Sequence, residues 1–246
     1  MKPIRAIIPA AGKGRRLQRI SGDLPKAMFP VAGKPILTFV LDNISFIEQS
    51  NTYIVVGCGR GKDLKGESMI VAYRRDCFDM ISMETFWLST APSVPGSSYG
   101  VDQSSCPRCT TAVVLKHDSA EQPFLFLKTH LDHKGAQARL FGAIQILQYV
   151  SDKKLPFVLT GDMNARPEAA EIQAFVNCKS HAVVDITSGI QGTFHGFGTR
   201  PTMSKIDYIF TDMESDPAES YAYNDVPVEG LYVSDHLPVF GFVTVG

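Results

Sequence analysis

The sequence has little of what marks specialised classes of protein. Its formal net charge is −1, from 24 basic and 25 acidic residues, so no overall electric field would hold the chain on nucleic acid or an anionic membrane. The 246 residues include five Cys, an odd and small number that does not indicate a disulfide framework. No apolar run approaches the roughly 20 residues of a membrane span. We therefore expect no membrane segment and a cytoplasmic location.

The rest of the composition is that of an ordinary globular protein, with 44% hydrophobic and 20% charged residues. The length suits one large domain or two small ones. Hydrophobic periodicity predicts a mixture of strands and helices. The expected strands are residues 4–9, 53–56, 69–73, 78–88, 111–116, 124–129, 156–160, 206–210 and 237–243, and the expected helices are 35–48, 135–150 and 169–175.

The first fifty residues contain a glycine-rich loop after an apolar strand. Gly12 and Gly14 would let backbone N–H groups approach an anion, and Arg16 and Lys26 could neutralise a triphosphate. With the Pro-Val-Ala-Gly-Lys-Pro segment at 30–35, these residues resemble the signature of sugar-phosphate nucleotidyltransferases, which implies that they bind a nucleotide. The resemblance covers about a fifth of the chain, and the residues that follow do not supply the base- and sugar-binding segments of such an enzyme.

Later segments place chemically active residues at the ends of apolar strands. His130 ends one strand. Asp162 and Asn164 follow another at a spacing of two, which puts both side chains on one face of an extended backbone. His236 directly follows an acidic residue near the C-terminus, and an imidazole with an acid nearby suits general acid–base chemistry. Asp207 could accept a hydrogen bond from the His236 ring and so fix its tautomer.

The segments Thr-His-Leu-Asp-His, Gly-Asp-Met-Asn, Ile-Asp-Tyr-Ile-Phe and Ser-Asp-His-Leu-Pro-Val follow one another in this order. Together they resemble the endonuclease/exonuclease/phosphatase superfamily over about three quarters of the chain. The resemblance implies an α/β fold, a two-sheet α/β sandwich of the DNase I-like type, with an N-terminal strand–loop–helix in place of its usual first elements. The implied partner is a phosphorylated small molecule or nucleic acid, between which the fold alone does not choose.

The resemblance also implies a role for each matching residue. His130, Asn164 and His236 would contact the phosphate, and Arg108 would support the phosphate pocket. Asp162 would orient or deprotonate the attacking water. The implied reaction is the hydrolysis of a phosphoester.

A metal ion and its ligands follow from the same resemblance. Asp207 would orient His236, and Asp235 would help to hold Mg²⁺ or Mn²⁺, which prefer oxygen ligands and act as Lewis acids. The superfamily's usual Asn on the first strand and metal-binding Glu on the second have no counterpart here. Glu67 is the candidate replacement ligand, and Lys128 stands where the superfamily usually has Asn.

We therefore predict two units, a nucleotidyltransferase-like fragment at 1–52 and an endonuclease/exonuclease/phosphatase-like domain at 53–246, which could merge into one fold. The predicted function is a metal-dependent phosphoesterase impaired by the missing Glu. Losing one such electrostatic contributor typically costs about 10²–10³ in rate. The alternatives are a nucleotidyltransferase acting on a sugar phosphate and an inactive chimeric protein.

Overall fold

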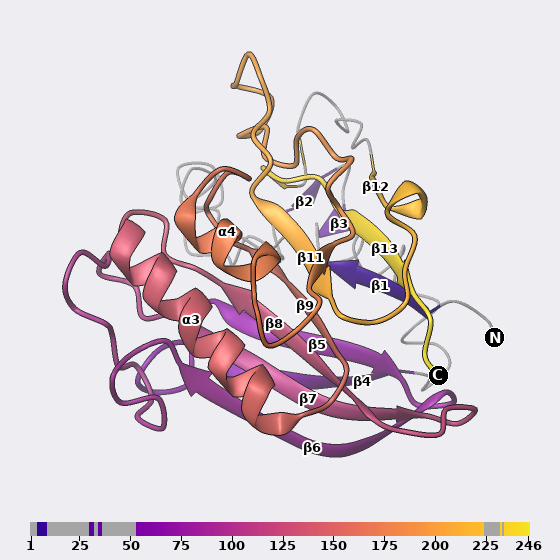
Figure 1. The fold of residues 1–246 in the computed structure, drawn as a ribbon. Helices are drawn as coiled ribbons and strands as arrows, with labels where there is room; N and C mark the ends of the chain where they lie inside the picture. Colours follow the sequence, from indigo (N-terminus) through magenta and orange to yellow (C-terminus); the bar gives the residue numbers. More distant parts are fainter. Residues whose placement is uncertain (1–3, 9–29, 32–33, 36–52, 224–231, 233) are drawn as a thin grey trace.

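A six-stranded sheet is the centre of the computed structural model, which describes residues 4–8, 30–31, 34–35, 53–223, 232 and 234–246. The strand order is β10-β11-β9-β8-β7-β6, of which β11 to β6 are labelled in Figure 1. Only the pair β8–β9 is parallel; the other neighbours are antiparallel. The bounds are β6 Phe78–Trp87, β7 Cys109–His117, β8 Phe124–His130, β9 Phe157–Asp162, β10 Val184–Asp185 and β11 Asp207–Thr211.

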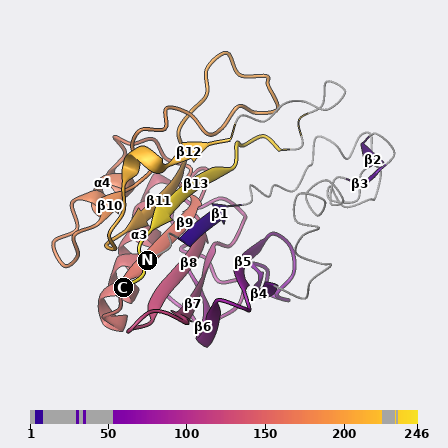
Figure 2. The same ribbon diagram turned by 90° about the vertical axis from the view of Figure 1, so that its right-hand side faces the viewer.

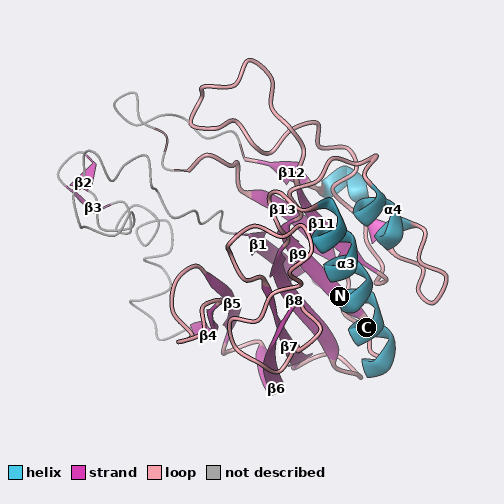
Figure 3. Cartoon of the chain, turned by 90° about the vertical axis from the view of Figure 1, so that its left-hand side faces the viewer, coloured by secondary structure: helices cyan, strands magenta, loops and turns pink. Residues whose placement is uncertain are grey.

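Two helices cover one face of this sheet, α3 (Ala136–Lys153) and α4 (Ala170–Val176) (Figure 3). The longer helix, α3, connects β8 to β9, because parallel neighbours need a crossover connection. The backbone N–H groups of Gln137 and Ala138 at its N-terminus donate to Asp102, a residue of a distant loop. The core under the helices includes Ile146 and Phe175, together with alternate residues of the strands.

Smaller sheets lie on the opposite face of the central sheet (Figure 2). The first is the hairpin of β4 (Tyr53–Gly59) and β5 (Ser68–Arg74), and the second has the order β1-β13-β12. A second hydrophobic core fills the space between these layers, with Val71 and Val243 packed against Val158. The remaining bounds are β1 Ile4–Ile8, β12 Tyr221–Ala222 and β13 Val239–Val243, with a separate pair of β2 Pro30–Val31 and β3 Lys34–Pro35 and the 3-10 helix η2 Pro217–Glu219.

The expected two-sheet α/β sandwich is confirmed, and so are the longer elements predicted from periodicity. The helix expected over 35–48 lies outside the described residues. The short strands β10 and β12 and the 3-10 helix were not expected, because two or three residues carry no periodicity. No helix in the described part of the chain has the length and apolar character of a membrane span.

Candidate active site

The residues singled out in the later segments meet at one edge of the central sheet. His130 and Asp162 are the last residues of the parallel strands β8 and β9, so both strands deliver them to the same edge. Asp207 is the first residue of β11 and is the register partner of Asp162. His236 lies three residues before β13, which brings it to the same edge from the opposite layer. All four side chains therefore converge between the layers.

His130 contacts a carboxylate on each side of its ring. Its Nδ1 lies 2.5 Å from Glu67 Oε1, and its Nε2 lies 3.2 Å from Asp162 Oδ2. Burial lowers the pKa of His130, but the two carboxylates outweigh it, so the pKa is raised overall. Burial raises the pKa of Glu67, but the His130 contact and the nearby Arg60 bring it down to about 2. Both shifts favour the charged forms of the pair.

His236 has a carboxylate partner of its own. Its Nδ1 lies 2.8 Å from Asp207 Oδ2, the partner that the sequence suggested. Burial opposes the charged ring, yet the hydrogen bond to Asp207 and the surrounding carboxylates raise the pKa of His236 to about 9. Its Nε2 lies 3.9 Å from Asp162 Oδ2. The Phe194 ring, 4.8 Å from the His236 ring between centroids, packs against it.

Asp162 is therefore shared between two cationic rings. Burial raises its pKa, but His130 and His236 lower it overall, so the group is ionised at neutral pH. The Asn164 backbone N–H donates to Asp162 Oδ1 at 2.8 Å, which closes a tight turn after β9. This turn places Asn164 at φ 49°, the left-handed region that Asn tolerates better than most residues. Its amide donates to the Leu131 carbonyl at 3.0 Å.

A layer of buried charge lies behind Glu67. Arg60 Nη2 lies 3.0 Å from Glu67 Oε2, and Trp87 Nε1 donates to the Arg60 carbonyl at 2.8 Å. Arg108 lies 3.4 Å from Asp132 through its Nε, and both side chains are buried. Arg60 was missed at the sequence level; its position between two glycines directly after a strand was the signal that could have found it. Arg60 holds Glu67, and through it His130, in place.

The site has donors that can hold a metal ion. Asp162, Asp207 and His236 bring possible ligand atoms within 4.8 Å of one another, and the protonated His236 ring would have to lose a proton before its nitrogen could bind a metal. Two carboxylates and an imidazole suit Mg²⁺ or Mn²⁺ better than a soft metal. The backbone carbonyl of Asp235, the residue before His236, accepts from the His195 and Gly196 N–H groups. The metal-binding roles of Asp235 and Glu67 stay predictions.

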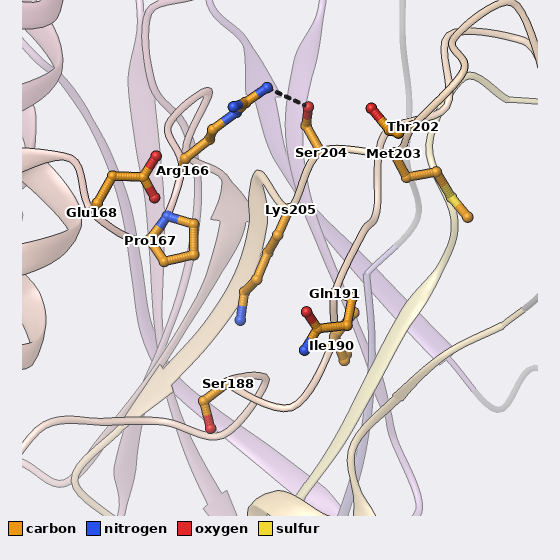
Figure 4. A pocket seen from close by; sticks show the side chains of 10 residues that line it. All are labelled: Arg166, Pro167, Glu168, Ser188, Ile190, Gln191, Thr202, Met203, Ser204 and Lys205. Atoms are coloured by element: carbon orange, nitrogen blue, oxygen red, sulfur yellow. Dashed lines mark hydrogen bonds between the residues drawn. The ribbon is translucent and has the colours of Figure 1, made fainter.

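A pocket of about 330 Å³ adjoins this edge of the sheet (Figure 4). Arg166 and Lys205, which line it, lie two residues from Asn164 and Asp207. Arg166 donates to Ser204 Oγ at 3.3 Å, the contact drawn in Figure 4. Lys205 Nζ lies 2.9 Å from Asp185, so its charge is already paired. The lining is mainly polar, and includes Glu168, Ser188, Gln191 and Thr202.

The structure thus gathers five of the predicted residues into one cluster, His130, Asp162, Asn164, Asp207 and His236, and adds Glu67 beside them. Arg108 lies one layer behind, against Asp132 and His133. The predicted nucleotide-binding residues Gly12, Gly14, Arg16 and Lys26 lie outside the described residues.

Comparison with known families agrees with this geometry. The family model described as Endonuclease/Exonuclease/phosphatase family matches residues 84–236, more than half of the chain. The chain belongs to this family. The residues of the chain that match the family model include β7 to β11 and end at His236.

Solved structures of the same family are similar over most of the chain. The endonuclease/exonuclease/phosphatase from Bacteroides vulgatus is 26% identical with a TM-score of 0.73, covering 84% of this chain and 81% of that one. The mannosyl-6-phosphatase of Bacteroides thetaiotaomicron is 29% identical with a TM-score of 0.66, covering 84% of this chain and 82% of that one.

A second family model, Nucleotidyl transferase, matches residues 5–155. The Bifunctional protein GlmU of Methanococcus maripaludis is 47% identical over 58 residues, which are 23% of this family protein and 14% of that relative. The chain thus spans a small part of such relatives. The two family models overlap at residues 84–155. This range includes the end of β6 and all of β7 and β8, which form antiparallel pairs in the sheet that also contains β9 and β11.

Proposed function

We propose that the chain is a metal-dependent phosphoesterase of the nuclease or phosphatase type, which hydrolyses a phosphodiester or a phosphomonoester. The single observation that supports this most strongly is the pair of cationic histidines around Asp162. His130 and His236 reach it from two layers, and each is held by a carboxylate of its own. Such an arrangement presents positive N–H groups to phosphoryl oxygens next to an ionised carboxylate that can orient water.

Each residue has a defined part in the proposed reaction. His130 and His236 hold phosphoryl oxygens, and Glu67 and Asp207 keep the two rings in orientation. Asp162 orients the attacking water; its lowered pKa favours orienting the water over accepting its proton in the ground state. A bound Mg²⁺ or Mn²⁺ would stabilise the negative charge that develops on the phosphoryl group.

The proposed activity is impaired relative to a complete family site. The Glu that usually ends the second strand and binds the metal has no counterpart in the sequence. We expect a cost of about 10²–10³ in rate from one missing electrostatic contributor. If the wild-type protein, with no carboxylate ligand introduced by mutation, were as active as a family member that has this Glu, this part of the proposal would be contradicted.

The test is the hydrolysis of bis(p-nitrophenyl) phosphate with Mg²⁺, with Mn²⁺ and with EDTA. Turnover should need the metal, disappear in His236→Ala and persist in His117→Ala, a matched control at the opposite edge of the sheet. An absence of turnover in a cooperatively folded protein would overturn the proposal and favour an inactive chimeric protein.

A second candidate, a nucleotidyltransferase acting on a sugar phosphate, is favoured by the family-model match over 5–155 and by the similarity to GlmU over 58 residues. It rests on Gly12, Gly14, Arg16 and Lys26. Binding of a nucleoside triphosphate that is lost in Lys26→Ala would support it. If the wild type bound no nucleoside triphosphate, this candidate function would be excluded.

A further inference from the structure

Lys128 occupies a chemically unusual position in β8. Along this strand, Leu125 and Leu127 belong to the core under the helices, whereas Phe124 and Phe126 pack in the core between the sheets. Side chains alternate along a strand, so Lys128 lies on the same face as Phe126 and His130. Its side chain therefore lies on the face between the layers, two residues before His130 in β8.

The groups around Lys128 leave its charge without a close anion. Its register partners on β7 and β9 are Thr111 and Thr160, which are neutral. The charged groups in electrostatic range are Asp207, Asp162 and Glu67. None of them forms an ion pair with Lys128 within the described part of the chain, because each carboxylate is engaged with His130, His236 or Arg60.

Lys128 is half-buried, and partial burial already disfavours an ammonium group without a close anion. Burial lowers the pKa of Lys128 more than the three distant carboxylates raise it. A buried cation becomes stable when an anion reaches it. The anion that this site is shaped to receive lies between His130 and His236, on the face to which Lys128 belongs.

We propose that Lys128 is a phosphate-binding cation of this site, which holds a phosphoryl oxygen from between the two sheets. This inference rests on the proposed function and extends it to a residue at which the superfamily usually has Asn. A fixed positive charge there has two opposite consequences. It attracts the phosphate and repels a divalent cation.

The first measurement is the binding of orthovanadate to the full chain by calorimetry, after divalent metal has been removed with a chelating resin, because EDTA in solution would itself complex vanadate. Lys128→Met should weaken binding about tenfold or more, the effect of losing one charge-assisted hydrogen bond. Lys128→Arg should stay within about threefold of the wild type, because it keeps the charge. Lys116→Met, on the exposed part of β7, is the matched control and should change nothing. If Lys128→Met does not unfold cooperatively in urea, Lys128→Gln replaces it.

The second measurement is the binding of Mn²⁺ alone, by electron paramagnetic resonance. The neutral variants should bind Mn²⁺ several-fold more tightly than the wild type, while they bind orthovanadate more weakly. If Lys128 had a merely structural role, the neutral variants would bind both Mn²⁺ and orthovanadate more weakly. Equal orthovanadate affinity in the wild type and the neutral variants would overturn the inference. Lys128-dependent binding without any turnover would instead overturn the proposed phosphoesterase alone.

Discussion

At the scale of single residues, the site is built from carboxylate–imidazole pairs. Glu67 pairs with His130 and Asp207 with His236, and Asp162 lies between the two rings. Burial alone would lower the pKa of both rings, but the neighbouring carboxylates raise both overall. The pKa of His236 therefore depends mainly on Asp207, whereas that of His130 depends on Asp162 first and on Glu67 second.

The first residue-scale prediction concerns the acid behind His236. Asp207→Asn removes the charge that holds the His236 pKa at about 9, so we expect this pKa to fall towards its ordinary value near 6.5. The measurement is an NMR titration of the ring protons. Asp212→Asn is the control, because Asp212 contacts His181 instead. A His236 pKa that stays near 9 in Asp207→Asn would contradict the assignment.

The second prediction concerns Glu67 and separates a role in positioning His130 from a role as a metal ligand. Both of its oxygens are already engaged, by His130 and by Arg60, so we expect it to position His130. Glu67→Gln should lower turnover about 10–100-fold while the affinity for Mn²⁺ changes less than about threefold. A large loss of Mn²⁺ affinity, measured in the absence of substrate, would instead support Glu67 as a metal ligand.

At the scale of elements, the parallel pair β8–β9 decides where the chemistry lies. Both strands run from a buried start to a polar end, and α3 returns the chain so that the two ends coincide. The helix is held by Ile146 and its neighbours, which pack on the apolar face of the sheet. The helix face thus supplies stability, and the opposite face supplies both a second core and the site.

This division predicts different effects for two isoleucines of α3. Ile146 is fully buried and Ile144 is 55% exposed. Ile146→Ala should lower the free energy of unfolding by about 2–5 kcal/mol, because it leaves a cavity, whereas Ile144→Ala should change it little. Urea unfolding measures both. Equal destabilisation by the two substitutions would show that the helix packs through another face.

At the scale of the whole molecule, opposite charges buried in one site make stability depend on pH from two sides. The folded-state pKa of Glu67 is lowered to about 2, so its stabilisation is present above about pH 4.5 and is lost as the pH falls towards 2. The folded-state pKa of His236 is raised to about 9, so its stabilisation is present below about pH 6.5 and is lost as the pH rises towards 9.

We therefore predict a stability maximum between about pH 5 and 6.5 from these two groups. Above it, the His236 contribution that is lost is at most roughly 3 kcal/mol, the equivalent of its pKa shift. Unfolding midpoints in urea between pH 3 and 9 measure the profile. In Asp207→Asn the alkaline slope should flatten; an unchanged slope would assign it to another group.

The domain division is also a question of the whole molecule. β1 pairs with β13 through five register partners, from Ile4–Val243 to Ile8–Val239. We propose that the N-terminal unit merges with the sandwich through this pairing. Limited proteolysis within 9–52 should then leave the fragment that contains β1 bound to the rest, in a complex that survives gel filtration. A released fragment and an unchanged remainder would support two separate units.

The sequence by itself determined the alternation of apolar residues in β8 and β9, the order of the four polar segments and therefore the family and the sandwich. Periodicity and motif order are local properties, which need no knowledge of distant contacts. The identity of His130, Asp162, Asn164, Asp207 and His236 as one group also followed from motif order.

The tertiary structure alone decided which acid serves His130. Glu67 and His130 are 63 residues apart, and nothing local in either segment indicates their contact at 2.5 Å. The same holds for Arg60 behind Glu67 and for the position of Lys128 within electrostatic range of Asp207 and Asp162. Such contacts arise when the β4–β5 hairpin packs on the central sheet, because burial between two layers is what brings distant charges into range of one another.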